Sequence, residues 1–596
     1  MGAFPSIRAL REAYAAGSVT PRAFLTECLQ KVRADDHHAW ISVISDEQLE
    51  EYLRGLESLD PSLPLWGVPF AVKDNIDLEG LPTTAACREF EYRPERSSFA
   101  VERLIKAGAV PLGKTNLDQF ATGLVGVRSP YGECENSIKR EYISGGSSSG
   151  SAVSVALGEV QFALGTDTAG SGRVPAAFNN IVGLKGTCGR VSTTGVVPAC
   201  RSIDCVTVFA CTADDLRTVF ETMSAFDPAD PFARKAPMPH GFGKSFVFAV
   251  PEKSDLEFFG DSEAERLFNE AAGVLESIGG VRKTISLRPF LEAAKLLYER
   301  SFVAERYAGN REFFEKHLDA CLPVIKTIIG GSLKFSAADL FADRERLMEL
   351  KREAYGELEG CSCALIPTAG TIYKRSEVDA DPIRLNSNLG YYTNFMNLLD
   401  FCAIALPAGF RKGGEKDGMP FGITVFARAF SDEALLSLGA RYLNARRIPT
   451  GAHLAAFEES SEEKLPEEPL EIAVCGAHLE GLPLNWQLKE CGAVLSEKTI
   501  SAKGYRMFLL NGTGIKKPGM IRDEKSPCSF ELEVYRVPSE NVGRFLSQIP
   551  YPLGLGKVRL EDGREVTGFI CEGEAVKGCT DISEYGSFRK FIESQK

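Results

Sequence analysis

The chain reads Gly145-Gly-Ser-Ser-Ser-Gly-Ser-Ala152 and then Gly165-Thr-Asp-Thr-Ala-Gly-Ser-Gly-Arg-Val-Pro-Ala-Ala-Phe178, two glycine- and serine-rich stretches on which nearly every functional inference depends. The small and aliphatic residues from Ser151 to Leu164 can pack closely against other backbone. Glycine permits unusual backbone angles, and consecutive N–H groups in such a turn point into one concavity that suits an anion. The stretches therefore predict a loop with the raw material of an oxyanion hole.

A phosphate-binding loop is the competing interpretation of these glycines. The stretches lack the G-x-x-x-x-G-K-[ST] pattern, and they do not show a G-x-G-x-x-G order after a strand. The motif rules therefore disfavour phosphate binding.

The two stretches resemble the amidase signature family of serine hydrolases, and the resemblance runs from roughly Ala13 to His453. In that family the nucleophile is the serine of a G-T-D-x-x-G-S segment, which is Ser171 here. A second serine after a Gly-Gly pair corresponds to Ser147, and the lysine of a hydrophobic V-K-D-N segment corresponds to Lys73. The resemblance implies that Ser147, held in a cis peptide, relays a proton between Lys73 and Ser171. It also implies an oxyanion hole made by the N–H groups of Thr168, Ala169, Gly170 and Ser171.

The chemistry needs these residue types, because a serine hydroxyl is a poor nucleophile until a neighbouring base removes its proton. The chain has only six histidines, and none lies near the signature stretches. A lysine with its ordinary pKa would be protonated, so Lys73 must be buried among apolar groups or lie near other cations. Its sequence neighbours Phe70, Ala71 and Val72 are apolar. A lone lysine or serine is usually a solvated surface residue, but all three stand here at the spacing of the family.

Residues 117–132 indicate which subfamily the chain resembles. Their sequence is similar to that of allophanate hydrolases, in which backbone around Gly123 contacts the substrate. The segment Arg201-Ser-Ile-Asp-Cys205 also resembles that subfamily. Asp167 and Arg173 are better assigned to holding the signature loops than to chemistry.

Residues 287–317 form a long predicted helical region that bears on substrate recognition. Allophanate hydrolases hold the substrate carboxylate with a Tyr and an Arg eight positions apart, which are Tyr298 and Arg306 here. On a straight helix such residues lie about 80° around the axis and about 12 Å along it, so the helix must bend or the side chains must lean together. The alternative is a surface arginine paired with a glutamate at helical spacing.

An α/β architecture follows from alternating strand and helix patterns, and the resemblance implies the amidase signature fold, a mixed sheet covered by helices. Residues 7–34 predict two short helices, and residues 66–73 a buried strand that ends at Lys73. A helix at 99–108 and a strand at 110–116 follow. Further elements are predicted as a strand at 246–250 and a helix at 262–278.

At 596 residues the chain exceeds a single ordinary core, and we expect two domains. An amidase signature domain is expected over 1–456, an acidic linker over 457–469 and a C-terminal domain over 470–596.

The C-terminal domain is β-rich by pattern, with strands expected at 505–511, 529–537 and 566–571. It resembles the C-terminal domain of long-form allophanate hydrolases, itself similar in fold to γ-glutamylcyclotransferases. The resemblance implies that it removes carbon dioxide from the first product, with His478 as the candidate residue and Glu533 as a weaker partner. A core histidine with one backbone hydrogen bond is an equal alternative for His478.

The net charge of −13 argues against a nucleic-acid or acidic-membrane partner, since no basic stripe offsets it. The sixteen cysteines form no C-x-x-C pair, and no secretory signal or stretch of eighteen apolar residues is present, so reduced thiols in the cytoplasm are expected. We expect no metal and no cofactor, because the histidines are few and isolated. Any biotin-dependent urea carboxylase is expected to be a separate protein.

The sequence thus predicts a homodimeric hydrolase that cleaves the amide of allophanate, releasing ammonia and a carboxylated amine that loses carbon dioxide, in urea or biuret catabolism. Three alternatives stay open. One concerns the C-terminal domain alone and makes it an interaction or dimerisation module without catalytic function. A general amidase for small amides would keep the catalytic residues but have no use for Arg306 or the second domain. An amidotransferase A-type subunit would need partner proteins and a glutamine source of ammonia.

Overall fold

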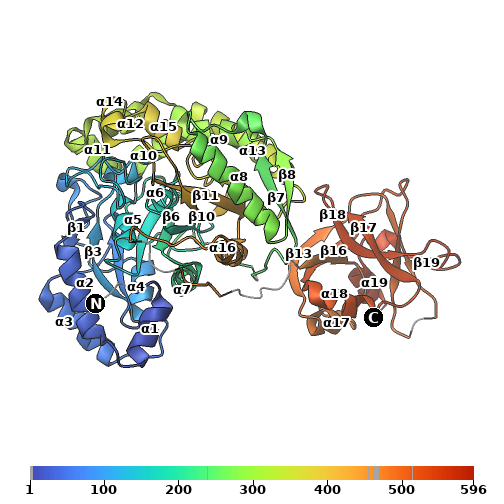
Figure 1. Ribbon diagram of the computed structural model, residues 1–596. Helices are drawn as coiled ribbons and strands as arrows, with labels where there is room; N and C mark the ends of the chain where they lie inside the picture. The colour runs from blue at the N-terminus through green and yellow to red at the C-terminus, as the bar shows by residue number, and fades with distance from the viewer. Residues whose placement is uncertain (1–3, 238, 454–456, 462–468, 513, 596) are drawn as a thin grey trace. The chain divides into compact units, whose positions relative to one another are not determined.

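The computed structural model describes residues 4–237, 239–453, 457–461, 469–512 and 514–595. The chain divides into two compact units (Figure 1). The first comprises Met1–Pro239 with Lys244–Glu463, and the second comprises His240–Gly243 with Lys464–Lys596. The central residues of the expected linker, 462–468, lie outside the described part. Among the described residues, no helix is long and apolar enough to cross a membrane.

In its described residues, the first unit is built on one mixed sheet of eleven strands in the order β1-β3-β2-β4-β6-β5-β10-β11-β9-β7-β8. β2 lies parallel between β3 and β4, whereas β6, β5, β10 and β11 run antiparallel to their neighbours. The strands are β1 Trp40–Val43, β2 Pro69–Lys73, β3 Val110–Thr115, β4 Phe162–Asp167, β5 Val182–Lys185, β6 Cys205–Ala210, β7 Phe246–Pro251, β8 Gly280–Ile285, β9 Cys363–Pro367, β10 Phe401–Phe410 and β11 Pro420–Arg428. The predicted α/β architecture is confirmed.

Sixteen α-helices of the described chain cover this sheet and its edges (Figure 1). They are α1 Ile7–Ala15, α2 Pro21–Arg33, α3 Asp46–Glu57, α4 Phe99–Lys106, α5 Ser149–Ala156, α6 Val174–Phe178, α7 Ala213–Met223, α8 Ser262–Ser277, α9 Arg288–Glu299, α10 Ala304–Gly309, α11 Arg311–His317, α12 Pro323–Gly331, α13 Ala337–Glu357, α14 Arg375–Ala380, α15 Arg384–Leu389 and α16 Asp432–Arg446. The two predicted N-terminal helices are confirmed. Thr20 caps α2 by accepting from the amide of Ala23, and Pro21 occupies the first helical position, where no amide donor is needed.

The prediction of a loop for the first glycine- and serine-rich stretch is wrong from Ser149 onward. That residue begins α5, in which every residue is buried. Gly150 explains how a helix fits there, because a Cβ at this position would lie 2.0 Å from the carbonyl oxygen of Ala39. The small side chains let α5 pack tightly against the backbone around it, so the expected close packing is found in helical form.

The predicted helical region 287–317 is broken. α9 ends at Glu299, and Arg300 is extended (φ −127°, ψ −171°) before a short 3₁₀ turn leads into α10. The side chain of Asp343 on α13 fixes this break by accepting from both the amide (2.9 Å) and the hydroxyl (2.6 Å) of Ser301. In Figure 1, α10, α11, α12 and α15 gather at one end of the first unit.

The described part of the second unit has a five-stranded sheet in the order β13-β16-β12-β18-β17 and a three-stranded sheet in the order β15-β14-β19. Its elements are β12 Leu470–Val474, α17 Asn485–Glu490, β13 Val494–Ile500, β14 Tyr505–Leu509, β15 Pro518–Arg522, β16 Glu531–Val537, α18 Ser539–Leu546, β17 Leu553–Arg559, β18 Glu565–Cys571, β19 Thr580–Asp581 and α19 Phe588–Ser594. β14, β16 and β18 confirm the three predicted strands, and the unit has its own core around Ile472, Val534 and Phe530.

Candidate active site

Lys73 is the last residue of the inner strand β2 and lies at its carboxyl end. All five of its residues are buried, and Phe70 stacks on Phe162 of the parallel strand β4 at 5.0 Å between ring centroids. Because β2 and β4 run parallel, their carboxyl ends open at the same edge. Lys73 therefore ends its strand beside the end of β4, where the second signature stretch begins.

The ammonium group of Lys73 is fully buried and faces two hydroxyls. Nζ donates to Oγ of Ser147 at 2.8 Å and to Oγ1 of Thr166 at 2.7 Å. Burial lowers the pKa of Lys73 to about 7, against the opposite influence of Asp118 and other nearby carboxylates. No carboxylate in the described part of the chain forms an ion pair with it. A large fraction of Lys73 is therefore neutral near pH 7 and can accept a proton.

The two signature stretches are joined by hydrogen bonds. Ser148 Oγ donates to the carbonyl of Thr166 (3.1 Å) and accepts from its amide (3.2 Å). The peptide bond between Gly146 and Ser147 is cis, as the resemblance implies. A Cβ at Gly146 would lie 2.1 Å from Oδ2 of Asp118, so glycine is required at this position.

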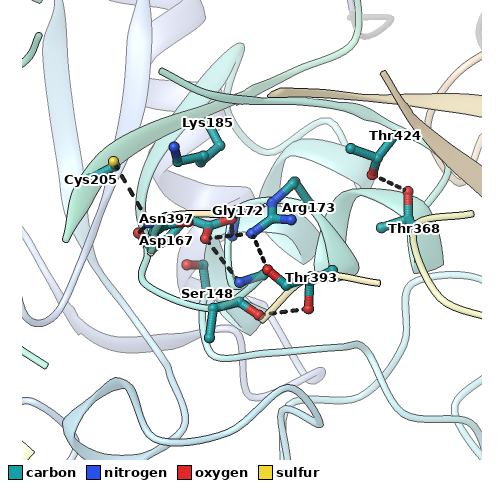
Figure 2. Close-up of polar contacts among 12 residues, drawn as sticks. Ser148, Asp167, Gly172, Arg173, Lys185, Cys205, Thr368, Thr393, Asn397 and Thr424 are labelled. Carbon is teal, nitrogen blue, oxygen red and sulfur yellow. Dashed lines mark hydrogen bonds and ion pairs between the residues drawn. The ribbon is translucent and has the colours of Figure 1, made fainter. Parts of the chain in front are cut away.

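A buried ion pair between Asp167 and Arg173 holds the second stretch (Figure 2). Nε and one Nη of Arg173 each donate to a carboxylate oxygen at 2.9 Å. The carboxylate also accepts from the amides of Gly170 (2.9 Å) and Gly172 (3.0 Å). Burial alone would raise the pKa of Asp167, but the charge and hydrogen bonds of Arg173 hold it below its usual value. These contacts agree with a role in holding the loop.

The four amides expected to form the oxyanion hole are not equivalent. The N–H of Gly170 is already donated to Asp167, whereas those of Thr168, Ala169 and Ser171 donate to no group of the described chain. Ser171 is almost fully buried, and its hydroxyl makes no hydrogen bond to another described residue. Three amides and one nucleophile candidate are thus available at the same turn.

Side chains from two other segments support this turn. The hydroxyl of Thr168 donates to Asp204, which also accepts from the amides of Ala199 (2.8 Å) and Cys200 (3.1 Å). Figure 2 shows the supports from the segment before β10, where Thr393 donates to the carbonyl of Ala169 at 2.6 Å. From the same segment, Asn397 Nδ2 donates to the carbonyl of Asp167 at 2.8 Å.

The structure brings Tyr298 and Arg306 together. One Nη of Arg306 donates to the Tyr298 hydroxyl at 2.6 Å, and the guanidinium lies over the ring. The other Nη donates to Oγ1 of Thr122 (3.0 Å) and to the carbonyl of Ala121 (3.3 Å). The break at Arg300 resolves the difficulty of two residues eight positions apart. Arg306 is buried rather than a surface arginine, so the alternative interpretation is wrong.

Gly123 lies against the carboxylate of Asp118, where a Cβ would come within 2.4 Å of Oδ2. Asp118 accepts from the amides of Val125 (3.1 Å), Gly126 (3.0 Å) and Arg128 (2.9 Å). This carboxylate thus shapes the loop that carries Gly123 and borders the Arg306 site.

Sequence reasoning missed three residues of this site. Thr166 directly precedes Asp167 in the signature, but no sequence pattern predicts that its hydroxyl accepts a hydrogen bond from Lys73. Asp118 and Arg128 both stand in the stretch that narrowed the subfamily, and a charged residue in an otherwise apolar or glycine-rich loop was the signal available for each.

In the second unit, His478 is buried beside Phe569, with ring centroids 4.9 Å apart. Its Nε2 lies 2.8 Å from Oε1 of Gln487, and burial lowers its pKa. The residue lines a small pocket, which Lys517 also lines. Asn485 donates to the backbone carbonyl of His478 at 2.9 Å.

Glu533 does not serve as the partner of His478 in the described structure. Its carboxylate accepts from the amide of Glu480 (2.6 Å) and the hydroxyl of Tyr535 (3.0 Å), and it pairs with Arg589 (3.1 Å). His478 has Gln487 as its side-chain partner instead, so the expected pairing of His478 with Glu533 is not found among the described residues.

Two family models match the chain. The amidase model matches residues 23–436, and the model of the allophanate hydrolase C-terminal domain matches residues 470–593. The chain is similar to the urea amidolyase of Saccharomyces cerevisiae, with 43% identity over 582 residues, which cover 94% of this chain and 31% of that protein. It is 30% identical over 469 residues to the A-type subunit of the glutamyl-tRNA(Gln) amidotransferase of Methylacidiphilum infernorum, covering 73% of this chain and 93% of that one.

The solved structure of the allophanate hydrolase of Kluyveromyces lactis matches with a TM-score of 0.74 and 39% identity, covering 99% of both chains. The chain spans about a third of the length of the urea amidolyases that it matches.

Proposed function

This chain belongs to the amidase family and carries an allophanate hydrolase C-terminal domain, and from that premise we propose that it hydrolyses allophanate. One observation carries the choice of substrate. Arg306 is fully buried, contacts the Tyr298 hydroxyl, and forms no ion pair with any described carboxylate. A buried cation of this kind calls for an anionic partner, and the carboxylate of allophanate supplies one.

The first step releases ammonia. Neutral Lys73 accepts the proton of Ser147 as Ser147 accepts the proton of Ser171, and Ser171 Oγ attacks the terminal amide carbon. The negative oxygen of the tetrahedral intermediate accepts hydrogen bonds from the free amides of Thr168, Ala169 and Ser171. The amide of Gly170 instead holds the loop in place by its hydrogen bond to Asp167. The proton returns to the amide nitrogen, the C–N bond breaks, and an acyl-enzyme remains on Ser171.

The second step is hydrolysis of that acyl-enzyme. Water gives a proton to the same relay, attacks the acyl carbon, and the C–O bond to Ser171 breaks as the serine regains its proton. The product is an amine that carries two carboxylates. Its nitrogen gains a proton as the bond to one carboxylate breaks, which gives carbon dioxide and carbamate. Carbamate gains a second proton and separates into ammonia and a second carbon dioxide.

In this proposal His478 and the pocket around it act on the dicarboxylated amine. The buried imidazole beside Gln487, with Lys517 lining the same pocket, supports this role because the pocket offers a cation and a titratable ring to a small anion. The proposed domains are 1–456 for amide cleavage, 457–469 as linker and 470–596 for the second reaction.

Two other functions have less support. An amidotransferase A-type subunit is favoured by relatives of lower identity, such as the 30% identical protein that covers 73% of this chain. A general small-amide amidase would leave the buried Arg306 without an anionic partner and the second domain without a use.

The protein is further proposed to be a cytoplasmic homodimer with a functional link to a biotin-dependent urea carboxylase. All sixteen cysteines lie among the described residues and are free, which fits a reducing compartment. The likeness to proteins named urea amidolyase supports the link to urea metabolism.

The test compares ammonia release from allophanate, biuret, malonamate and glutamine by wild type and by Arg306→Leu. Biuret is the matched neutral substrate, because it has an amide where allophanate has a carboxylate. Wild type should prefer allophanate, and the variant should lose roughly 10- to 100-fold in kcat/KM for allophanate, the worth of a charge-assisted hydrogen bond, with little effect on biuret.

The control variant is Arg311→Leu on the neighbouring helix α11, where the arginine is exposed and paired with Glu315. It should leave all four rates unchanged. Turnover of glutamine or biuret as fast as allophanate by wild type would overturn the substrate assignment.

A further inference from the structure

Arg128 lies at the boundary between the predicted site and an open pocket. The pocket has a volume of about 520 Å³, and its wall includes Arg128, Tyr298 and Asn394. Tyr298 contacts Arg306, and Asn394 directly follows Thr393, which supports the oxyanion turn. The pocket therefore opens next to the groups assigned to the substrate.

Arg128 is only 4% exposed, and the nearby carboxylate of Asp118 is the charge that most opposes its burial. Its two Nη atoms donate to the carbonyls of Thr122 (3.0 Å) and Pro382 (2.5 Å). Within the described chain, Nε is buried without a hydrogen-bond partner, and no carboxylate forms an ion pair with the guanidinium. Fully buried arginines are rare unless they are paired, and the Asp118 carboxylate lies outside ion-pair distance, so this guanidinium can still pair with an anion from outside the chain.

Arg306 shares these features, and the two guanidiniums meet at one residue. Arg128 bonds to the carbonyl of Thr122, and Arg306 bonds to its hydroxyl. Nε of Arg306 is likewise buried and without a partner among the described residues. Burial lowers the pKa of Arg128, while Asp118 and Tyr298 oppose this lowering and the charge of Arg306 adds to it.

We propose that Arg128 is a second carboxylate-binding residue of this site, and that Arg128 and Arg306 together restrict the enzyme to small amides that carry a carboxylate at the end remote from the scissile bond. The inference rests on the proposed function and extends it. Two guanidiniums that flank one carboxylate can each meet one of its oxygens, and the arrangement rejects a neutral amide because binding it would leave both cations buried and unpaired.

A purely structural role for Arg128 predicts something different. The bonds to Thr122 and Pro382 tie two loops together, and a variant that loosened them would slow every substrate alike. The readout must therefore compare a charged substrate with a neutral one of the same shape in the same variant.

The experiment measures kcat and KM for allophanate and for biuret in wild type, Arg128→Met and Arg128→Lys, with calorimetric binding of malonate as a second measurement. Arg128→Met should lower kcat/KM for allophanate by about 10- to 100-fold, mainly through KM, and should weaken malonate binding similarly, with biuret little changed. Arg128→Lys keeps the positive charge but lacks the two parallel donors of the guanidinium. It should therefore recover part of the kcat/KM and malonate binding that Arg128→Met loses.

The matched control is Lys295→Met, which removes a positive charge from the exposed wall of the same pocket. It should change kcat/KM for allophanate by less than about threefold. An equal loss for allophanate and biuret in Arg128→Met, or unchanged malonate binding, overturns the inference. If wild type itself does not prefer allophanate, the proposed function fails, and the malonate titration still decides whether Arg128 binds a carboxylate.

Discussion

Lys73 and Ser147 are joined by a hydrogen bond of 2.8 Å between Nζ and Oγ, inside a site where neither side chain is exposed. Seventy-four positions separate them in the chain. The bond puts a lysine of lowered pKa directly on the serine that precedes the nucleophile in the proposed relay.

The pH dependence of activity should follow Lys73. Only the neutral amine can accept a proton, and its pKa is lowered to about 7. We therefore expect kcat/KM for ammonia release to rise tenfold per unit below about pH 7 and to level off above it. Initial rates at constant ionic strength from about pH 5.5 to 9 check this. A profile that stays flat below pH 7, or a rise that begins only near pH 10, would contradict the role of Lys73 as base.

Replacing Lys73 with methionine should abolish activity and stabilise the fold. Because the folded state lowers the pKa from 10.5 to about 7, the unfolded chain binds more protons between these values. The native lysine therefore costs stability, fully so below pH 7 and not at all above about pH 10.5. At pH 7 the cost is about 4 kcal/mol, offset by about 2 kcal/mol for the two lost hydrogen bonds.

Urea unfolding of wild type and Lys73→Met at pH 7 and near pH 10 measures this difference. A net gain of about 2 kcal/mol at pH 7 that turns into a net loss near pH 10 is the expected result, because the two hydrogen bonds of Lys73 still count after the cost of its buried charge has nearly gone. Equal stability of the two proteins at both values would show that Lys73 is not desolvated.

Asp167→Asn should destabilise the first unit strongly. The substitution leaves the guanidinium of Arg173 buried without its counter-charge, which costs about 3–5 kcal/mol in buried pairs. The midpoint of thermal unfolding should fall and activity should fall with it, because the turn loses its anchor. Glu315→Gln, which breaks an exposed pair with Arg311, is the control and should leave the midpoint unchanged.

Gly170→Ala should disable the oxyanion turn. Gly170 has φ +125°, and a Cβ there would lie 2.5 Å from Oγ1 of Thr393. If the turn shifts, its amides no longer reach the oxyanion. We therefore expect kcat to fall by about 10²- to 10³-fold, the loss found when one oxyanion donor is removed. Gly273→Ala is the matched change in the middle of α8, where a Cβ meets nothing within 4 Å, and it should retain activity with slightly higher stability. An active Gly170→Ala enzyme would exclude this turn from the reaction.

The sequence predicted the elements whose signals are local. The strand ending at Lys73 and the α/β alternation follow from periodicity and apolar runs, and the signature motif carried the residues of the relay. The spacing of Tyr298 and Arg306 raised a difficulty that the sequence could not resolve, since the break at Arg300 depends on Asp343 of a distant helix.

Other features depend on tertiary packing and have no local signal. Helix α5 contains glycine, serine and valine, which have weak helix propensity, and its complete burial and the lack of room for a Cβ at Gly150 are visible only in the folded chain. Thr166 becomes the second acceptor of Lys73 because β2 and β4 are neighbours, and the engagement of Gly170 by Asp167 is visible only in the folded turn.

The break at Arg300, directly after α9, affects how proteins of this fold can change their substrate selectivity during evolution. Tyr298 and Arg306 lie on the helical segment formed by α9 and α10, whereas Lys73 and Thr166 lie on the central strands β2 and β4. Selectivity can therefore be exchanged by replacing this segment together with the loop that carries Arg128, while the strands keep the hydrolytic residues. A chimaera that receives both segments from an amidase for neutral amides would inherit the donor's substrate range and retain the recipient's pH profile.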